Sequence, residues 1–186
     1  SLLRGARQLS ACVASSPSLP RATSCRAANR SMSDLFDESR RATLERRIDE
    51  WLATVHHQHP NAVAAVKSPD DDRRWMVRLR GETKEFTTIW LQLGQRTLRY
   101  ETYVMPYPDE NVGEVLELLL RRNERLVGAH YALGAENAIF LMGELLLSTV
   151  NDEELDRVIG TLFATVEAQF GGLVQRAFAS RFADDK

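Results

Sequence analysis

The stretch from Glu101 to Asn111, ETYVMPYPDEN, holds the densest group of side chains in the chain that could do chemistry. Carboxylates beside tyrosines can serve as general acids and bases when a pocket shifts their pKa values. On a strand, Glu101 and Tyr103 would share one face, because alternate side chains point to the same side. Asp109 would lie at the start of a helix, where free amides and the helix dipole favour a carboxylate.

Two interpretations of this stretch follow. In the first, Glu101, Tyr103 and Asp109 surround a pocket that binds a small molecule or catalyses a reaction. In the second, the same residues form a structural joint between a strand and a helix, with the acids placed for the helix dipole. We favour the joint, because it explains the acids, the asparagine and the prolines without a substrate.

The other motifs indicate no metal, cofactor or catalytic residue. His56, His57 and His59 cluster near a helix end, but adjacent histidines on a helix point in different directions and make no i, i+4 chelating pair. The glycines of GAHYALG have the wrong spacing for a dinucleotide-binding turn, and neither a phosphate-binding loop nor a nucleophile elbow occurs. The two cysteines, Cys12 and Cys25, both lie near the N-terminus. We therefore expect a protein that is not an enzyme.

The composition is that of a globular protein without a strong overall field. The 186 residues are 44% hydrophobic and 27% charged, with a formal net charge of -2, which suits one domain with a core and a tail. A near-neutral chain is not drawn as a whole to nucleic acid or to anionic membranes. No apolar run reaches the ~20 residues of a membrane-spanning helix. We expect a cytoplasmic protein with neither nucleic-acid nor membrane partners.

Residues 1–33 are predicted to be a disordered leader rich in arginine and serine. The leader contains five arginines and no acid, and its composition buries too little apolar surface to offset the entropy of ordering. Such leaders resemble organelle transit peptides, and LSAC at Leu9–Cys12 matches a lipoprotein cleavage box without its hydrophobic stretch. Translation from upstream of Met32 is the interpretation that we favour. The folded domain is expected over residues 34–183.

Periodicity and turn residues predict an α+β fold in the order α-β-β-β-α-β-β-α. The expected fold is an antiparallel five-stranded sheet with packed helices. The predicted helices cover residues 38–57, 111–123 and 151 to about 171, and the predicted strands cover residues 75–80, 84–93, 97–105, 128–134 and 138–148.

Three local signals set the helix ends. Asn111 with Glu114, and Asn151 with Glu154, have the spacing of a capping box. Gly171 and Gly172 predict the end of the last helix, because glycine is common just past a helix C-terminus.

Three blocks of this sequence, ETYVMPYPDENVGEVLELLLRRN, LVGAHYALGAENAIFLMGELLL and ELDRVIGTLF, resemble the YbjN family of bacterial sensory transduction regulators. The resemblance covers roughly residues 44–180 and is strongest from residue 101 to residue 160, with the actinobacterial branch most similar. It implies the fold of type III secretion chaperones and a small cytosolic protein that often dimerises and binds other proteins. It carries over no catalytic residue, since no reaction is established for the family.

Two predicted strands are apolar on both faces. In KEFTTIWLQL, Trp90 points away from Ile89 and Leu91, and in AIFLMGELLL, Met142 points away from Leu141. A sheet covered on one side alternates apolar with polar residues. Either the three helices cover both faces, or a twin subunit or partner protein covers the second one.

The leading hypothesis from the sequence is a non-enzymatic protein-binding module that forms a homodimer and acts as a chaperone or regulator of another protein. It would bury a segment of a partner protein against its sheet, around Trp90, Tyr103 and Met142. The sequence does not identify that partner.

Overall fold

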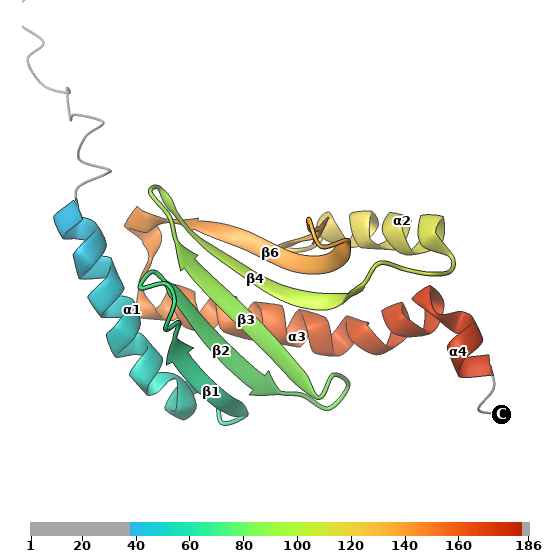
Figure 1. The fold of residues 1–186 in the computed structure, drawn as a ribbon, viewed down its shortest axis with the longest axis horizontal. Helices are drawn as coiled ribbons and strands as arrows, with labels where there is room; N and C mark the ends of the chain where they lie inside the picture. The colour runs from blue at the N-terminus through green and yellow to red at the C-terminus, as the bar shows by residue number, and fades with distance from the viewer. Residues whose placement is uncertain (1–37, 184–186) are drawn as a thin grey trace, which may run out of the picture. The chain divides into compact units, whose positions relative to one another are not determined.

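The computed structural model describes residues 38–183. The predicted leader, residues 1–33, and the first residues of the predicted domain lie outside the described residues, so both stay predictions. The described part has helices and strands in the order α-β-β-β-β-α-β-β-α-α (Figure 1). Their bounds are α1 Glu38–Gln58, β1 Ala62–Lys67, β2 Arg74–Arg80, β3 Phe86–Leu93, β4 Thr97–Pro106, α2 Val112–Asn123, β5 His130–Leu133, β6 Ala138–Leu146, the 3-10 turn η2 Leu147–Thr149, α3 Asp152–Ala177 and α4 Ala179–Ala183.

The strands form one antiparallel sheet in the order β1-β2-β3-β4-β6-β5. Strands β1 to β4 follow one another as hairpins. The chain then passes through α2 and returns, so β6 lies beside β4 and β5 becomes the second edge strand. The predicted α+β class with helices packed on an antiparallel sheet is confirmed.

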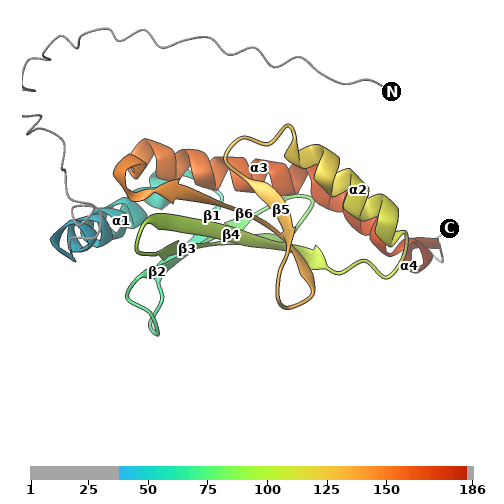
Figure 2. The ribbon, with the colours of Figure 1, turned by 90° about the horizontal axis from the view of Figure 1, so that it is seen from above.

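The helices lie on one side of the sheet (Figure 2). Every second residue of the central strands points to that side and is buried, for example Trp75 and Val77 on β2, Ile89 and Leu91 on β3, and Tyr100 on β4. The helices contribute the facing half of the core: Ile48, Trp51, Leu52 and Val55 from α1, and Leu155, Val158, Ile159, Leu162 and Val166 from α3. The possibility that the helices cover both faces is therefore wrong for the described chain.

The sheet has six strands, so the predicted count of five is wrong. The missed strand is β1, AVAAVK, which pairs with β2 through a register shift between Ala62 and Ala64. Four of its six residues are alanine or lysine, which are depleted in strands. Its pairing with β2 and its packing under α1, rather than its own propensity, keep it in the sheet.

The two capping-box predictions have different outcomes. The side chain of Asn151 accepts a hydrogen bond from the amide of Glu154 at 2.9 Å, which confirms the N-cap of α3. Asn111 makes no side-chain cap and has a left-handed backbone (φ 51°, ψ 32°). Its Nδ2 instead donates to the carbonyl oxygen of Arg176 at 3.0 Å, so the predicted capping box at Asn111 is wrong.

Helix α3 does not end at Gly171 and Gly172, as predicted, but continues to Ala177. Glycine inside a helix costs about 1 kcal/mol relative to alanine. Beyond the glycines, Leu173 and Ala177 are fully buried. Burial of this last turn against the sheet outweighs the local preference to stop.

Gly143 on β6 allows a close approach of three chain segments. The hydroxyl of Tyr100 donates a hydrogen bond to the carbonyl oxygen of Gly128 directly beside it. A Cβ atom at Gly143 would stand 2.6 Å from Cε2 of Tyr100 and closer still to the oxygen of Gly128. Because one of these neighbours is backbone, the sheet would have to shift to admit a methyl group.

We expect Gly143→Ala to lower the free energy of unfolding by about 1–3 kcal/mol, since overpacking a filled core has costs of that order. Gly160→Ala is the matched control: it lies inside α3 with nothing within 4 Å of its added Cβ, and should stabilise the protein by up to about 1 kcal/mol. Urea unfolding of both variants measures the two effects. Shifts of the same sign would contradict the proposed packing at Gly143.

Candidate functional site

The face of the sheet opposite the helices, here called the open face, carries large apolar side chains that the described chain leaves partly exposed. Paired residues in antiparallel strands lie side by side on one face. The register therefore places Met76 beside Trp90, Trp90 beside Glu101, Glu101 beside Met142, and Met142 beside His130. This row crosses the sheet from β2 to β5.

A second aromatic pair lies next to this row. Tyr103 pairs with Phe140, and their rings meet edge to face with centroids 5.8 Å apart and an interplanar angle of 82°. The side chain of Tyr103 is 42% exposed. The three residues predicted to bind a partner, Trp90, Tyr103 and Met142, thus share the open face, and their binding role stays a prediction.

Arginines stack on the aromatic rings of this face. The guanidinium carbon of Arg74 lies 4.2 Å from the ring centroid of Trp90, and that of Arg78 lies 4.3 Å from the centroid of Phe86. Arg80 approaches the same phenylalanine at 5.3 Å. Alternation along β2 already puts these arginines on one face, but the sequence did not reveal their aromatic neighbours, which depend on the register with β3.

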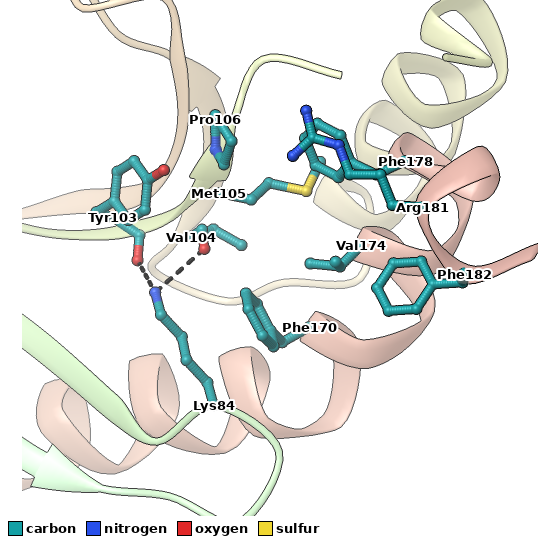
Figure 3. A pocket seen from close by; sticks show the side chains of 10 residues that line it. All are labelled: Lys84, Tyr103, Val104, Met105, Pro106, Phe170, Val174, Phe178, Arg181 and Phe182. Carbon is teal, nitrogen blue, oxygen red and sulfur yellow. Dashed lines mark hydrogen bonds between the residues drawn. The ribbon is translucent and has the colours of Figure 1, made fainter. Parts of the chain in front are cut away.

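A pocket of about 350 Å³ lies where the end of β4 meets the end of α3 (Figure 3). Its lining residues are Lys84, Tyr103, Val104, Met105, Pro106, Phe170, Val174, Phe178, Arg181 and Phe182. The walls are mainly apolar, with one cation from the loop between β2 and β3 and a second from α4. No local sequence pattern predicts this pocket, because its walls come from distant parts of the chain.

Lys84 differs from the other lining residues in its hydrogen bonds to the backbone and its lowered pKa. Its ammonium group donates hydrogen bonds to the carbonyl oxygens of Tyr103 and Val104, the latter at 3.1 Å, where a register shift interrupts the β4–β6 ladder. Burial lowers the pKa of Lys84 to about 8, although the negative charge of Glu167 acts in the opposite direction. Lys84 thereby satisfies two backbone carbonyl oxygens at the register shift between β4 and β6.

Glu167 on α3 fixes the loop that carries Lys84. Its carboxylate accepts hydrogen bonds from the backbone amides of Glu82 at 2.8 Å, Thr83 at 2.9 Å and Lys84 at 3.2 Å. Burial by itself would raise the pKa of Glu167, but the three amides and the charge of Lys84 outweigh it and lower the pKa. A side chain at Gly81 would collide with this carboxylate.

The structure does not bring Glu101, Tyr103 and Asp109 together around one pocket. Glu101 forms an ion pair with Arg99 at 3.0 Å on the open face. The carboxylate of Asp109 pairs with Arg181 at 2.6 Å. The pocket beside Tyr103 is lined by neither acid.

The contacts of the stretch ETYVMPYPDEN are those of a joint. The amides of Asp109 and Glu110 both donate to the carbonyl oxygen of Ala177, at 3.1 and 3.0 Å. The carboxylate of Glu110 accepts hydrogen bonds from the amide and hydroxyl of Ser180, which lower its pKa. These bonds tie the chain between β4 and α2 to the junction of α3 and α4.

The histidines and acids of the described residues do not gather into a metal site. Within residues 38–183, no three His, Cys, Asp or Glu side chains are grouped so that they could hold a metal ion. His59 lies 3.6 Å from Asp156, and His56 contacts the carbonyl oxygen of Ala62 at 3.0 Å. Among the same residues, no helix has the length and apolar content to cross a membrane.

The hydrogen bonds of Glu167 predict an acid-dependent stability. A carboxyl group with a lowered pKa in the folded state stabilises the fold above its unfolded pKa, near the ordinary value of 4.5, and loses this contribution as the pH falls through the folded pKa. When the pH falls from about 5 to about 3, we expect the free energy of unfolding to decrease less for Glu167→Gln than for the unmodified protein. Urea unfolding at both pH values tests this, with Glu136→Gln, at an exposed turn position, as control. Identical pH profiles for all three proteins would contradict it.

Comparisons with solved structures give two partial likenesses. A chain of the heterodimeric ExoU–SpcU complex from the type III secretion system of Pseudomonas aeruginosa matches with a TM-score of 0.47 and 16% identity, over 68% of this chain and 96% of that one. A chain of the ExsC–ExsE complex matches with a TM-score of 0.49 and 14% identity, over 69% and 94%. With both TM-scores below 0.5, neither likeness carries a conclusion about function.

Comparisons with known sequences identify the family of the chain. An uncharacterized protein of Mycobacterium tuberculosis is 39% identical over 125 residues, which are 67% of this chain and 65% of the relative. One of Mycobacterium leprae is 37% identical over 112 residues, or 60% and 61% of the two chains. The chain thus spans slightly less than two thirds of the length of these relatives. Residues 46–173 match the model of the YbjN family, described as "Putative bacterial sensory transduction regulator". The chain therefore belongs to the YbjN family.

Proposed function

We propose that this protein is a non-enzymatic protein-binding module, chaperone-like or regulatory, which buries a segment of a partner protein against the open face. One observation carries the proposal: the helices cover one side of the sheet, and the uncovered side holds large apolar and aromatic side chains, among them Met76, Trp90 and Met142. Membership of a family described as regulators supports it.

The composition of the open face suits a polypeptide ligand. Contiguous apolar surface on a soluble protein commonly marks an interaction site. Methionine side chains, here Met76 and Met142, adapt to differently shaped partners. Trp90 and Tyr103 are residue types that often dominate the binding energy of protein interfaces.

A second set of exposed apolar side chains supports the proposed homodimer. Leu120 on α2 is 69% exposed, Val127 before β5 is 80% exposed, and Leu133 at the end of β5 is 52% exposed. Strand β5 is also an edge of the sheet, and unpaired edges offer backbone groups to a second chain. We place this homodimer in the cytoplasm, where a regulator of other proteins would act.

We expect Trp90→Arg to abolish capture of the partner from native lysate by the immobilised full chain. A charged side chain in place of the indole ring of Trp90 would have to be desolvated on binding. Quantitative mass spectrometry of the retained proteins measures the loss. Ala53→Arg is the matched control, because it changes an exposed apolar residue of α1 to arginine and leaves both the open face and the proposed dimer residues unaltered. Equal recovery of the same proteins by the Trp90 variant would exclude the open face as the binding site.

The pocket beside Tyr103 favours a second candidate function, a sensor that binds a small molecule. Its volume of about 350 Å³ lies at the low end of the roughly 300–1,000 Å³ found for small-molecule sites. The apolar walls and the cation of Lys84 suit a ligand with an apolar body and a negatively charged end. The residues differ from those first considered, since only Tyr103 of the three lines this pocket.

For this candidate, we expect a medium-chain carboxylate such as octanoate to raise the melting temperature, because a ligand that binds the native state stabilises it by mass action. Val174→Trp should remove the shift by filling the pocket from α3. A thermal-shift titration of both proteins gives the answer. A shift that persists in the variant would place the carboxylate elsewhere, and no shift in either protein would leave this candidate without support.

A further inference from the structure

We infer that the partner segment is acidic, with carboxylates that meet three arginines of β2. This inference rests on the proposed function and specifies the chemistry of its partner. Arg74, Arg78 and Arg80 are here called the arginine stripe. They alternate along β2 with buried residues, so all three point to the open face, with Met76 between the first two.

The arginine stripe has few partners of opposite charge among the described residues. Hydrogen bonds from the amide of Arg73 and the side chain of Gln92 lower the pKa of Asp71, and the charge of Arg74 adds to this shift, so Arg74 has one carboxylate in its vicinity. Arg74, Arg78 and Arg80 stack on Trp90 and Phe86, and among the described residues none of their guanidinium groups has an ion pair within 4.0 Å or a hydrogen bond. The adjoining Arg73, by contrast, pairs with Glu38 and Glu45. Within residues 38–183, the charges of Arg78 and Arg80 are therefore left without a paired carboxylate.

The surrounding face reinforces this local charge. On β2 and β3 the residues that point to the open face include no acid: besides the stripe they are Met76, Phe86, Thr88, Trp90 and Gln92. Glu101 on β4 is already paired with Arg99. The chain as a whole has a formal net charge of -2. The positive surface is thus a property of this half of the open face and not of the overall composition.

The position of the arginines over aromatic rings leaves their N–H groups available to bind carboxylates. A guanidinium group over an aromatic ring can use its face for the ring and keep its N–H groups at its edge. That edge forms paired hydrogen bonds with a carboxylate, and such charge-assisted bonds are stronger than neutral ones. Arg78 and Arg80 are two residues apart on a strand, a separation of roughly 7 Å at about 3.3 Å per residue. Alternate side chains of an extended partner segment have the same spacing.

The same stacking argues against single-stranded nucleic acid as the occupant. Proteins that bind such strands combine a positive groove with aromatic ring faces on which bases stack. Here Arg74 lies over the ring of Trp90, and Arg78 and Arg80 lie over that of Phe86. The rings nearest the positive charge are therefore covered, while the aliphatic side chains of Met76 and Met142 suit apolar residues of a polypeptide.

The test compares three fluorescent probes on the full chain: a peptide that alternates glutamate with leucine or phenylalanine, its twin with glutamine in place of glutamate, and an oligouridylate of the same length. We expect the glutamate peptide to bind at least about tenfold more tightly than its twin at low salt. The triple variant Arg74→Gln, Arg78→Gln, Arg80→Gln should lose that preference. The control, Arg46→Gln, Arg121→Gln, Arg125→Gln, removes the same charge from exposed positions on α1, on α2 and just after α2 and should keep it.

Each other outcome overturns the inference in a recognisable way. Equal binding of the two peptides, lost in Trp90→Arg, would show an open face that binds polypeptides through apolar contacts alone, so the proposed function would stand without the acidic partner. Tighter binding of the oligouridylate than of either peptide would favour nucleic acid. A preference for glutamate that survives in the stripe variant but not in the control would move the acidic site to the helices. If no probe binds, the acidic segment is excluded, and lysate capture decides separately on the proposed function.

Discussion

The structure depends on the alternation of side chains in a single sheet that has helices on one side only. In β2, β3 and β4, every inward residue is buried on the helix side of the sheet, and every outward residue is left on the open face. A slip of one residue in any strand would exchange the two sets. The cost of exposing residues such as Trp75 and Leu91, both fully buried, therefore fixes the register. The same register places Arg74 beside the ring of Trp90, so the core determines the layout of the open face.

Helix α3 links the parts of the fold that are most distant in sequence. Near its middle, Glu167 holds the loop between β2 and β3 by three backbone amides. At its end, the carbonyl oxygens of Arg176 and Ala177 receive hydrogen bonds from the segment between β4 and α2. Both sets of bonds frame the pocket at Tyr103. Asp109 and Glu110 thus attach this part of ETYVMPYPDEN to the junction of α3 and α4, whereas Glu101 pairs with Arg99 on the open face.

The sequence predicted those features that local pattern controls. Five strands, three long helices and the N-cap of Asn151 follow from periodicity and from side chains that bond to their own backbone. The features it missed depend on distant contacts: β1 is held by β2 and α1 despite its alanines, and α3 continues past Gly171 because Leu173 is buried. Asn111 has the spacing of a capping residue, but a hydrogen bond to Arg176 competes for its side chain. Strand alternation placed Trp90, Tyr103 and Met142 on their face, whereas the stacking of arginines on β3 required the register, and the pocket required the packing of α3 against β4.

Arginines on aromatic rings have two effects on an uncovered sheet. They shield ring surface from water with their long stems and keep the charged ends hydrated, so a monomer with apolar residues on its open face remains less prone to associate through it. The long stem of lysine, and in part that of glutamate, would also shield the aromatic rings from water. Shielding alone therefore does not explain why these residues are arginine. Yet the outward positions of β2 are arginine at three of four places, with no acid on β2 or β3 facing them. The arginine side chains over Trp90 and Phe86 present planar groups of hydrogen-bond donors. These groups suit a partner whose carboxylates bind the guanidinium groups while its apolar side chains contact Met76 and Met142. The arrangement that shields the open face of the free protein would then be the one that selects its partner.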